Sequence, residues 1–202
     1  MTLPTLQELW DSHTGRLIDK WDFYLPLYTR YFERFRCFDR GLFPIVLEIG
    51  VCHGGSLQLW KKFFGTSIIL GVDIDPRCKE YEEEGIQIFT MDQTDPRIAD
   101  IHIGQFDIII DDGSHNIDDQ QETIRLLWPK LRDRGVYFIE DCHQFLPTPP
   151  LDSGSVGIYP WVSVFEKMNN FHPHRIVTGK PSRPLNHNEI FAYGKIDAKY
   201  RE

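Results

Sequence analysis

Short runs of apolar residues recur along the chain, and most of them run into glycine or acidic residues. Five of these runs are expected to be strands, because they are brief, rich in β-branched residues and bounded by turn residues. They cover 43–51, 67–75, 85–92, 107–112 and 135–141. The runs are continuous rather than alternating, which indicates that both faces of each strand are buried, as in a parallel sheet covered by helices.

Stretches with the apolar spacing of one helix face surround these strands. They cover 4–36, 56–64 and 117–132. Ser56 is the expected N-cap of the second helix, and Pro129 is expected to bend or shorten the third. The alternation of strands and helices predicts an α/β fold with a Rossmann-like, doubly wound, mostly parallel sheet.

The chain is expected to divide into an N-terminal helical segment, 1–42, and one α/β domain, 43–202. Within that domain, 145–165 contains four prolines and two glycines, which predicts an irregular loop. It is either a surface irregularity or a lid over the site. Two further strand candidates, 174–179 and 189–196, are expected to form an antiparallel C-terminal pair at one edge of the sheet.

Composition narrows the classes of function. The chain has 202 residues, of which 41% are hydrophobic, so it can bury a core. A net charge of −8 argues against a general nucleic-acid binder. No window approaches the roughly 20 apolar residues of a membrane helix. The four cysteines form no CxxC pair, and the N-terminus lacks the pattern of a signal peptide. A cytoplasmic, soluble protein is expected, without nucleic-acid or membrane partners.

The turn after the first strand, "LEIGVCHGGS" (47–56), indicates a ligand site. Its glycines allow a tight turn and a close approach of the backbone to a ligand. The spacing lacks the GxGxxG fingerprint of dinucleotide binding, which disfavours a dehydrogenase and favours a ligand without a pyrophosphate. Asp73, in "GVDID", follows about 20 residues later, where a carboxylate can bind the hydroxyls of a ribose.

Together, "LEIGVCHGG", "GVDID" and "MDQTD" resemble the first three motifs of class I S-adenosylmethionine-dependent methyltransferases. The resemblance implies that Gly50 and its neighbours line the methionine part of the cofactor and that Asp73 holds its ribose. Asp92 and Gln93 would lie by the adenine. The full set of implied cofactor residues is Glu48, Gly50, Gly54, Ser56, Asp73, Asp92, Gln93 and Asp111.

Paired acids end two neighbouring strands, in "IIDDGSH" and "YFIEDCH". Carboxylates that converge in one crevice repel one another unless they are protonated or bridged by a cation. Oxygen ligands point to a hard ion, Mg²⁺ first, with Mn²⁺ or Ca²⁺ as alternatives. The residues alone leave open whether Asp111 or Asp112 is the ligand. His115 is the candidate general base, and His143 is a weaker one.

The two acid motifs resemble, more narrowly, the metal-dependent sugar O-methyltransferases of macrolide and related antibiotic pathways. "IDKWDFYLPLYTRYF" also resembles a stretch that precedes their first strand. The resemblance implies metal binding by Asp112, Glu140 and Asp141, with Asp112 and His115 as catalytic residues and Asp111 near the cofactor.

The implied function is Mg²⁺-dependent transfer of a methyl group from S-adenosylmethionine to a hydroxyl of a small molecule, a sugar or a glycoside. A phenolic acceptor and a non-catalytic S-adenosylmethionine-binding protein are the alternatives. The resemblance leaves a homo-oligomer open.

Overall fold

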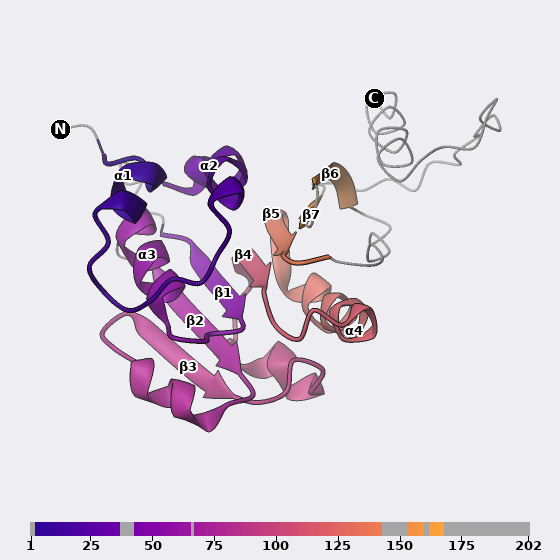
Figure 1. The fold of residues 1–202 in the computed structure, drawn as a ribbon. Helices are drawn as coiled ribbons and strands as arrows, with labels where there is room; N and C mark the ends of the chain where they lie inside the picture. Colours follow the sequence, from indigo (N-terminus) through magenta and orange to yellow (C-terminus); the bar gives the residue numbers. More distant parts are fainter. Residues whose placement is uncertain (1–2, 37–42, 66, 143–152, 160–161, 168–202) are drawn as a thin grey trace, which may run out of the picture.

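A computed structural model describes residues 3–36, 43–65, 67–142, 153–159 and 162–167. Its centre is one seven-stranded sheet with the order β3-β2-β1-β4-β5-β7-β6 (Figure 1). The strands are β1 (Ile45–Ile49), β2 (Ile68–Asp73), β3 (Ile86–Thr90), β4 (Phe106–Asp111), β5 (Leu131–Ile139), β6 (Ser153–Tyr159) and β7 (Val162–Lys167). The first five are parallel, and β7 pairs antiparallel with both β5 and β6. The predicted fold class is confirmed.

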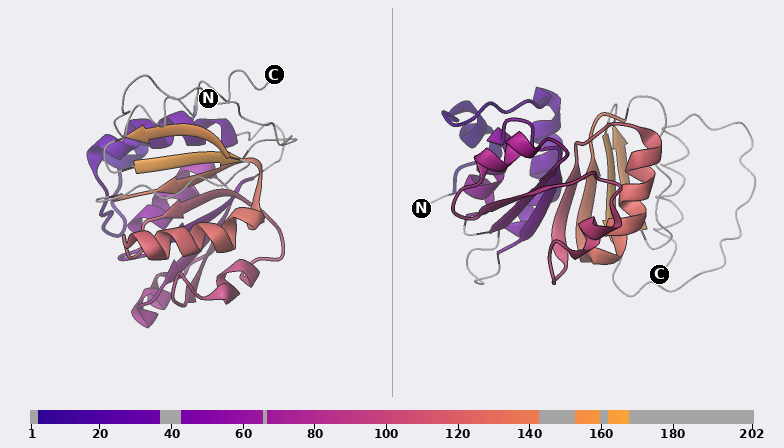
Figure 2. Two further views of the ribbon diagram at one scale, coloured as in Figure 1. Left: turned by 90° about the vertical axis from the view of Figure 1, so that its right-hand side faces the viewer. Right: turned by 90° about the horizontal axis from the view of Figure 1, so that it is seen from below.

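Helices cover both faces of the sheet, as the continuous apolar strands required (Figure 2). They are α1 (Leu6–Asp11), α2 (Leu25–Phe32), α3 (Gly55–Phe64) and α4 (Ile117–Leu127), with the short 3₁₀ turns η1 (Asp22–Tyr24), η2 (Glu33–Phe35), η4 (Pro76–Tyr81), η5 (Pro96–Asp100) and η6 (Trp128–Lys130). One core packs α1, α2 and α3 against the sheet, and the other packs α4 and η6 against the opposite face. Pro129 ends the last helix by turning it into η6, as predicted.

The prediction of helix throughout 4–36 is wrong between α1 and η1. Residues 12–21 are extended or turn there, because the apolar periodicity stops at Ser12, which is the C-cap of α1. Ser56 is also not the N-cap of α3. Gly54 takes that position with a φ of 74°, which places Ser56 inside the first turn.

The prediction of an irregular loop at 145–165 is wrong for two segments, which are the strands β6 and β7. Phe165 and Val164 are buried because β7 continues the sheet beside β5. The strand candidates 174–179 and 189–196 lie outside the described residues, so the antiparallel edge pair that the structure shows is an earlier one. Among the described residues, no helix has both the length and the apolarity to cross a bilayer.

The extended stretch 12–21 crosses the start of α3 at close range. A Cβ on Gly55 would collide with the carbonyl oxygens of Arg16 and Leu17, so only glycine permits this crossing. The guanidinium of Arg16 then donates to the carbonyl of Tyr81, 2.7 Å away. These contacts hold the N-terminal segment against the carboxyl ends of the strands, where ligands bind in open α/β sheets.

Candidate functional site

Two cavities open at the carboxyl ends of the strands, where the strand order reverses between β1 and β4. The smaller has a volume of about 170 Å³ and lies beside β2 and β3. The larger, of about 690 Å³, lies beside β4 and β5. Gly50, Asp73 and Gly113 line both cavities, so the two cavities adjoin each other.

The turn after β1 forms the wall between the cavities. Gly50 has a φ of 86°, and a Cβ there would collide with the carbonyl oxygen of Asp112. Asp73 closes the turn from the neighbouring strand, because its Oδ2 accepts from the backbone nitrogens of Val51 and Cys52, at 2.8 and 3.1 Å. Glycine at 50 therefore lets the ends of β1 and β4 meet, and Asp73 fixes the turn while it faces both cavities.

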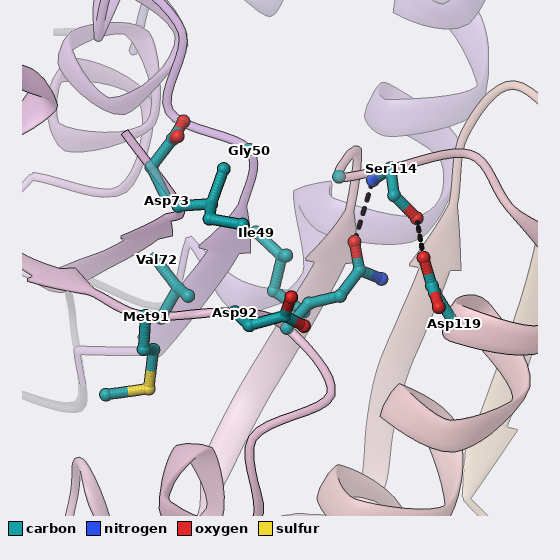
Figure 3. Close-up of a pocket in the computed structure, with 11 residues that line it drawn as sticks. Ile49, Gly50, Val72, Asp73, Met91, Asp92, Ser114 and Asp119 are labelled. Atoms are coloured by element: carbon teal, nitrogen blue, oxygen red, sulfur yellow. Dashed lines mark hydrogen bonds between the residues drawn. The ribbon is translucent and has the colours of Figure 1, made fainter. Parts of the chain in front are cut away.

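The smaller cavity contains most of the predicted adenosine side of the site (Figure 3). Asp92 lines it, and its Oδ1 accepts from the backbone nitrogen of Thr94 at 2.8 Å, a bond that lowers the pKa of this carboxyl. Gln93 lines the same cavity and links the loop after β4 to α4. Its Oε1 accepts from the Ser114 nitrogen at 2.7 Å, and its Nε2 donates to Thr123. Gln93 thus holds the loop after β4 in place.

Four predicted cofactor residues do not line either cavity: Glu48, Gly54, Ser56 and Asp111, of which Asp111 is described below. Glu48 is fully buried and accepts from the indole nitrogen of Trp60 at 2.9 Å; burial raises the pKa of its carboxyl. Ser56 is buried in the first turn of α3, and Gly54 supports the turn itself, with Tyr81 packed over it. These residues support the turn after β1, whose Gly50 lines both cavities.

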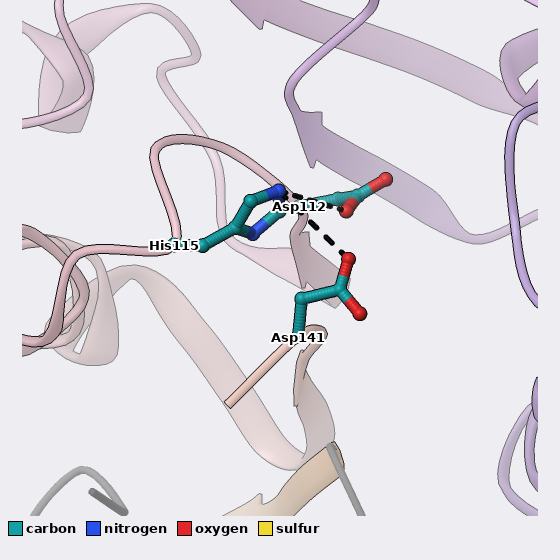
Figure 4. A group of neighbouring side chains, drawn as sticks. All are labelled: Asp112, His115 and Asp141. Carbon is teal, nitrogen blue, oxygen red and sulfur yellow. Dashed lines mark ion pairs between the residues drawn. The ribbon is translucent and has the colours of Figure 1, made fainter. Parts of the chain in front are cut away.

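A compact group of acids and one imidazole lies in the larger cavity (Figure 4). Ligand atoms of Asp112, His115 and Asp141 all lie within 4.8 Å of one another. The Nε2 of His115 is 3.9 Å from Asp112 Oδ1 and 3.8 Å from Asp141 Oδ2. His115 and Asp141 have φ values of 57° and 51°, in the left-handed region that residues other than glycine seldom adopt. Such conformations cost free energy and concentrate at functional sites.

Asp111 and Asp112 are separated by the pleat of the sheet and the end of the strand. Asp111, the last residue of β4, is fully buried on the α4 side, near Tyr137 and Gln93. Burial raises the pKa of Asp111 to about 7. Asp112 follows the strand and lines the larger cavity. Asp112 is therefore the aspartate of this pair that belongs to the group with His115 and Asp141. Asp111 instead accepts from the backbone nitrogen of Gly113, in the loop after β4.

Glu140 lines the larger cavity but does not belong to the compact group of three. Its Oε1 accepts from the hydroxyl of Tyr28 at 2.6 Å and from the ammonium of Lys20 at 2.9 Å. Burial, and then the charge of Asp112, raise the pKa of the Glu140 carboxyl well above its usual range. His143, the weaker base candidate, lies outside the described residues.

Lys20 is a residue of the candidate site that the sequence reasoning missed. Its side chain is 1% exposed, and its nitrogen lies 2.9 Å from Glu48 Oε1, 2.8 Å from Asp112 Oδ2 and 2.9 Å from Glu140 Oε1. Burial alone would lower the pKa of Lys20, but the three carboxylates outweigh it and the net pKa is raised. Only its place in the stretch "IDKWDFYLPLYTRYF" could have drawn attention to it, because nothing local marks a lone lysine as buried.

The larger cavity is strongly acidic. Six carboxylate residues line it, and Lys20 is the one lysine among its lining residues; the acids are Asp19, Asp22, Asp73, Asp112, Glu140 and Asp141. A crevice of this charge attracts cations and disfavours anionic ligands such as phosphates. Trp21, a residue that is 58% exposed, lines the same cavity.

Comparison with known proteins gives a consistent class of relatives, although no family model matches. The chain is 36% identical over 151 residues to demethylmacrocin O-methyltransferase of Streptomyces fradiae, which covers 68% of this chain and 36% of that protein. It is 38% identical over 133 residues to 8-demethyl-8-(2-methoxy-alpha-L-rhamnosyl)-tetracenomycin-C 3'-O-methyltransferase of Streptomyces olivaceus, covering 60% of this chain and 32% of that one. The matched part is thus about a third of the length of these curated relatives.

Solved structures agree with these relatives. MycE methyltransferase of the mycinamycin biosynthetic pathway, in complex with Mg, SAH and mycinamycin VI, superposes with a TM-score of 0.70 and 27% identity, covering 87% of this chain and 57% of that one. A putative caffeoyl-CoA O-methyltransferase from Staphylococcus aureus, at 12% identity and a TM-score of 0.58, shares the fold. The fold is that of S-adenosylmethionine-dependent methyltransferases, and the curated sequence relatives are O-methyltransferases.

Proposed function

We propose that this chain, which has the fold of the S-adenosylmethionine-dependent methyltransferases and sugar O-methyltransferases as relatives, moves a methyl group from S-adenosylmethionine to a sugar hydroxyl with the help of a divalent cation. One observation carries the proposal: the cavity of the predicted nucleoside residues adjoins a cavity with converging carboxylates and a histidine.

The cofactor would span the junction of the two cavities. Asp92 and Met91 line the smaller cavity, which suits a flat base and its polar edge. Asp73 lies at the junction, where the ribose would follow. The sulfonium would then enter the acidic cavity, whose excess of carboxylates favours a positively charged donor. The structure of the related methyltransferase MycE contains both SAH and Mg.

The donor groups fit a hard cation. Asp112 and Asp141 offer carboxylate oxygens, and Glu140 lines the same cavity. Carboxylate oxygen is the ligand type that Mg²⁺ prefers, whereas imidazole suits softer metals such as zinc. We therefore assign the cation to the acids and keep His115 as a base. A cation held there would supply Lewis acidity that lowers the pKa of an acceptor hydroxyl.

His115 would remove the proton of the acceptor. Its Nε2 lies beside both Asp112 and Asp141, and its side chain is 32% exposed, so it is accessible from the cavity. A base in hydrogen-bond reach of the acceptor contributes about 10²–10⁴-fold in rate. The cofactor supplies an activated methyl group, so the remaining task of the protein is to align oxygen, methyl carbon and sulfur.

The acceptor would occupy the larger cavity. Its volume of about 690 Å³ lies within the range of small-molecule sites, roughly 300–1,000 Å³. Trp21 provides an apolar surface on which the face of a sugar ring can rest, beside acids that can accept from sugar hydroxyls. The names of the relatives specify rhamnosyl-tetracenomycin and demethylmacrocin as acceptors, which supports a glycoside.

The test combines binding with turnover. Calorimetry with SAH should show binding, and labelled methyl transfer should occur with at least one member of a panel of sugars, glycosides and phenols. EDTA should abolish that transfer, and Mg²⁺ should restore it. The variant Asp141→Asn should lose turnover and keep SAH binding. Tight NADH binding without SAH binding overturns the class, transfer only to phenols overturns the acceptor, and activity that survives EDTA overturns the metal.

A further inference from the structure

One short stretch of the N-terminal segment contacts three of the six acids that line the larger cavity, Asp112, Glu140 and Asp141. Lys20 donates to Asp112 Oδ2 at 2.8 Å. The hydroxyl of Tyr24 donates to Asp141 Oδ1 at 2.7 Å, and that of Tyr28 donates to Glu140 Oε1 at 2.6 Å. We call Lys20, Tyr24 and Tyr28 the donor layer.

The donor layer occupies one oxygen of each aspartate and leaves the other facing His115. Lys20 holds Oδ2 of Asp112, while Oδ1 of the same carboxylate lies 3.9 Å from the imidazole. Tyr24 holds Oδ1 of Asp141, while Oδ2 lies 3.8 Å from the imidazole. One oxygen of each aspartate therefore points toward His115, as Figure 4 shows, while the other oxygen is held by Lys20 or Tyr24.

The two tyrosines of the donor layer are packed into the core. Tyr24 and Tyr28 are fully buried, and the ring of Tyr28 packs 4.8 Å from that of Phe138 on β5 and 5.0 Å from that of Trp60 on α3. Tyr24 also accepts, at 3.3 Å, from the backbone nitrogen of Asp141, the residue with the left-handed φ. The contact thus restrains both the side chain and the unusual backbone of that acid.

We propose that Lys20, Tyr24 and Tyr28 are positioning residues that orient Asp112, Asp141 and Glu140 for a divalent cation, so that the N-terminal segment is a working part of the metal site. This inference rests on the proposed function. Groups that orient metal ligands typically change the metal affinity about 10–100-fold when they are removed.

Tyr24→Phe is the cleanest test, because it removes one hydroxyl and keeps the buried ring. The matched control is Tyr137→Phe, which removes an equally buried hydroxyl on the opposite face of the sheet, 3.4 Å from Asp111 Oδ2. Mn²⁺ is the probe, and its binding to each full-length variant is titrated by electron paramagnetic resonance. Thermal unfolding is recorded in parallel.

Tyr24→Phe should bind Mn²⁺ about tenfold or more weakly than the wild type, and Tyr137→Phe should bind it unchanged. The Mg²⁺ concentration for half-maximal turnover should rise in Tyr24→Phe, and kcat should recover at saturating Mg²⁺. A purely structural role would lower the unfolding temperature and leave the Mn²⁺ affinity of the folded protein as it was. Tyr28→Phe gives a second, independent variant, for which the same weakening is expected.

The outcomes separate the two proposals. Failure of the wild type to bind Mn²⁺ refutes the metal site and with it the proposed function. Wild-type binding that both Tyr24→Phe and Tyr28→Phe retain in full refutes the positioning role alone. Equal weakening in Tyr137→Phe also refutes it, because the effect would then come from any lost buried hydroxyl.

Discussion

The ammonium nitrogen of Lys20 lies 2.8 Å from Oδ2 of Asp112, although 92 residues separate them along the chain. The lysine also contacts Glu48 and Glu140, so one buried cation balances part of the charge of three buried or half-buried acids. These three contacts join the N-terminal segment to the carboxyl ends of β1, β4 and β5. The same side chain therefore contributes to the buried charge balance and to the proposed metal site.

Lys20→Met should lower the free energy of unfolding by about 3–5 kcal/mol, because it leaves buried carboxylates without their counter-ion. Urea denaturation measures this loss. Adding Glu48→Gln should recover part of it, because one uncompensated buried charge disappears. Lys79→Met is the control; its pair with Glu82 is exposed and should change stability by less than about 1 kcal/mol. Equal losses in both variants would contradict the assignment.

His115→Gln should reduce kcat by about 10²–10⁴-fold, since a base and not a ligand is lost. SAH affinity and Mn²⁺ affinity should stay close to those of the wild type. Steady-state kinetics and calorimetry give these values. His102→Gln is the matched control, because His102 precedes the amino end of β4 whereas His115 follows its carboxyl end. A large loss of Mn²⁺ affinity in His115→Gln would identify the imidazole as a metal ligand instead.

Cys52 should report on cofactor binding through its alkylation. It is exposed, it lies in the turn after β1, and it lines the larger cavity. Burial raises the pKa of its thiol, so the rate of reaction with iodoacetamide should rise as the pH is raised above 8. SAH should slow that reaction. Mass spectrometry of a Cys37→Ser background locates the label.

Two less accessible thiols, the buried Cys78 and the partly buried Cys142, serve as internal controls in the same experiment. Burial raises the pKa of Cys78 to about 12 and that of Cys142 to about 11, so both should stay largely unlabelled at pH 8. Protection of Cys52 by SAH without any change at these two residues would place the ligand in the crevice. Unchanged labelling of Cys52 at saturating SAH would contradict the proposed cofactor position.

Trp21→Ala should raise the KM for the acceptor about tenfold, which corresponds to the loss of roughly 1.4 kcal/mol of ring contact. SAH and Mn²⁺ affinities should be unaffected, because the indole is on the cavity wall and is not among the acids. Phe23→Ala is the comparison, since Phe23 packs 6.0 Å from Trp21 but is not among the residues that line the cavity. A change in kcat alone, with constant KM, would exclude Trp21 as an acceptor surface.

Much of the fold could be predicted from local pattern. The β1, β2 and β4 strands are continuous apolar runs, and such runs require burial on both faces. The glycine turn at Gly50 and the acid at Asp73 were also predictable, because turns and strand ends have characteristic residues in the local sequence. Prediction failed at 12–21 and at β6 and β7, where pairing with distant segments sets the conformation.

The sequence by itself determined the parallel sheet, the order of its motifs and the presence of acids at two strand ends, because each of these depends on residues close together in the chain. Only the tertiary structure decided that Asp112 and not Asp111 faces the larger cavity, since the pleat and the end of β4 turn the two carboxylates apart. It also brought Lys20, Tyr24 and Tyr28 behind the acids. Those contacts span about a hundred residues, and a side chain carries no local sign of the distant partner that will bury it.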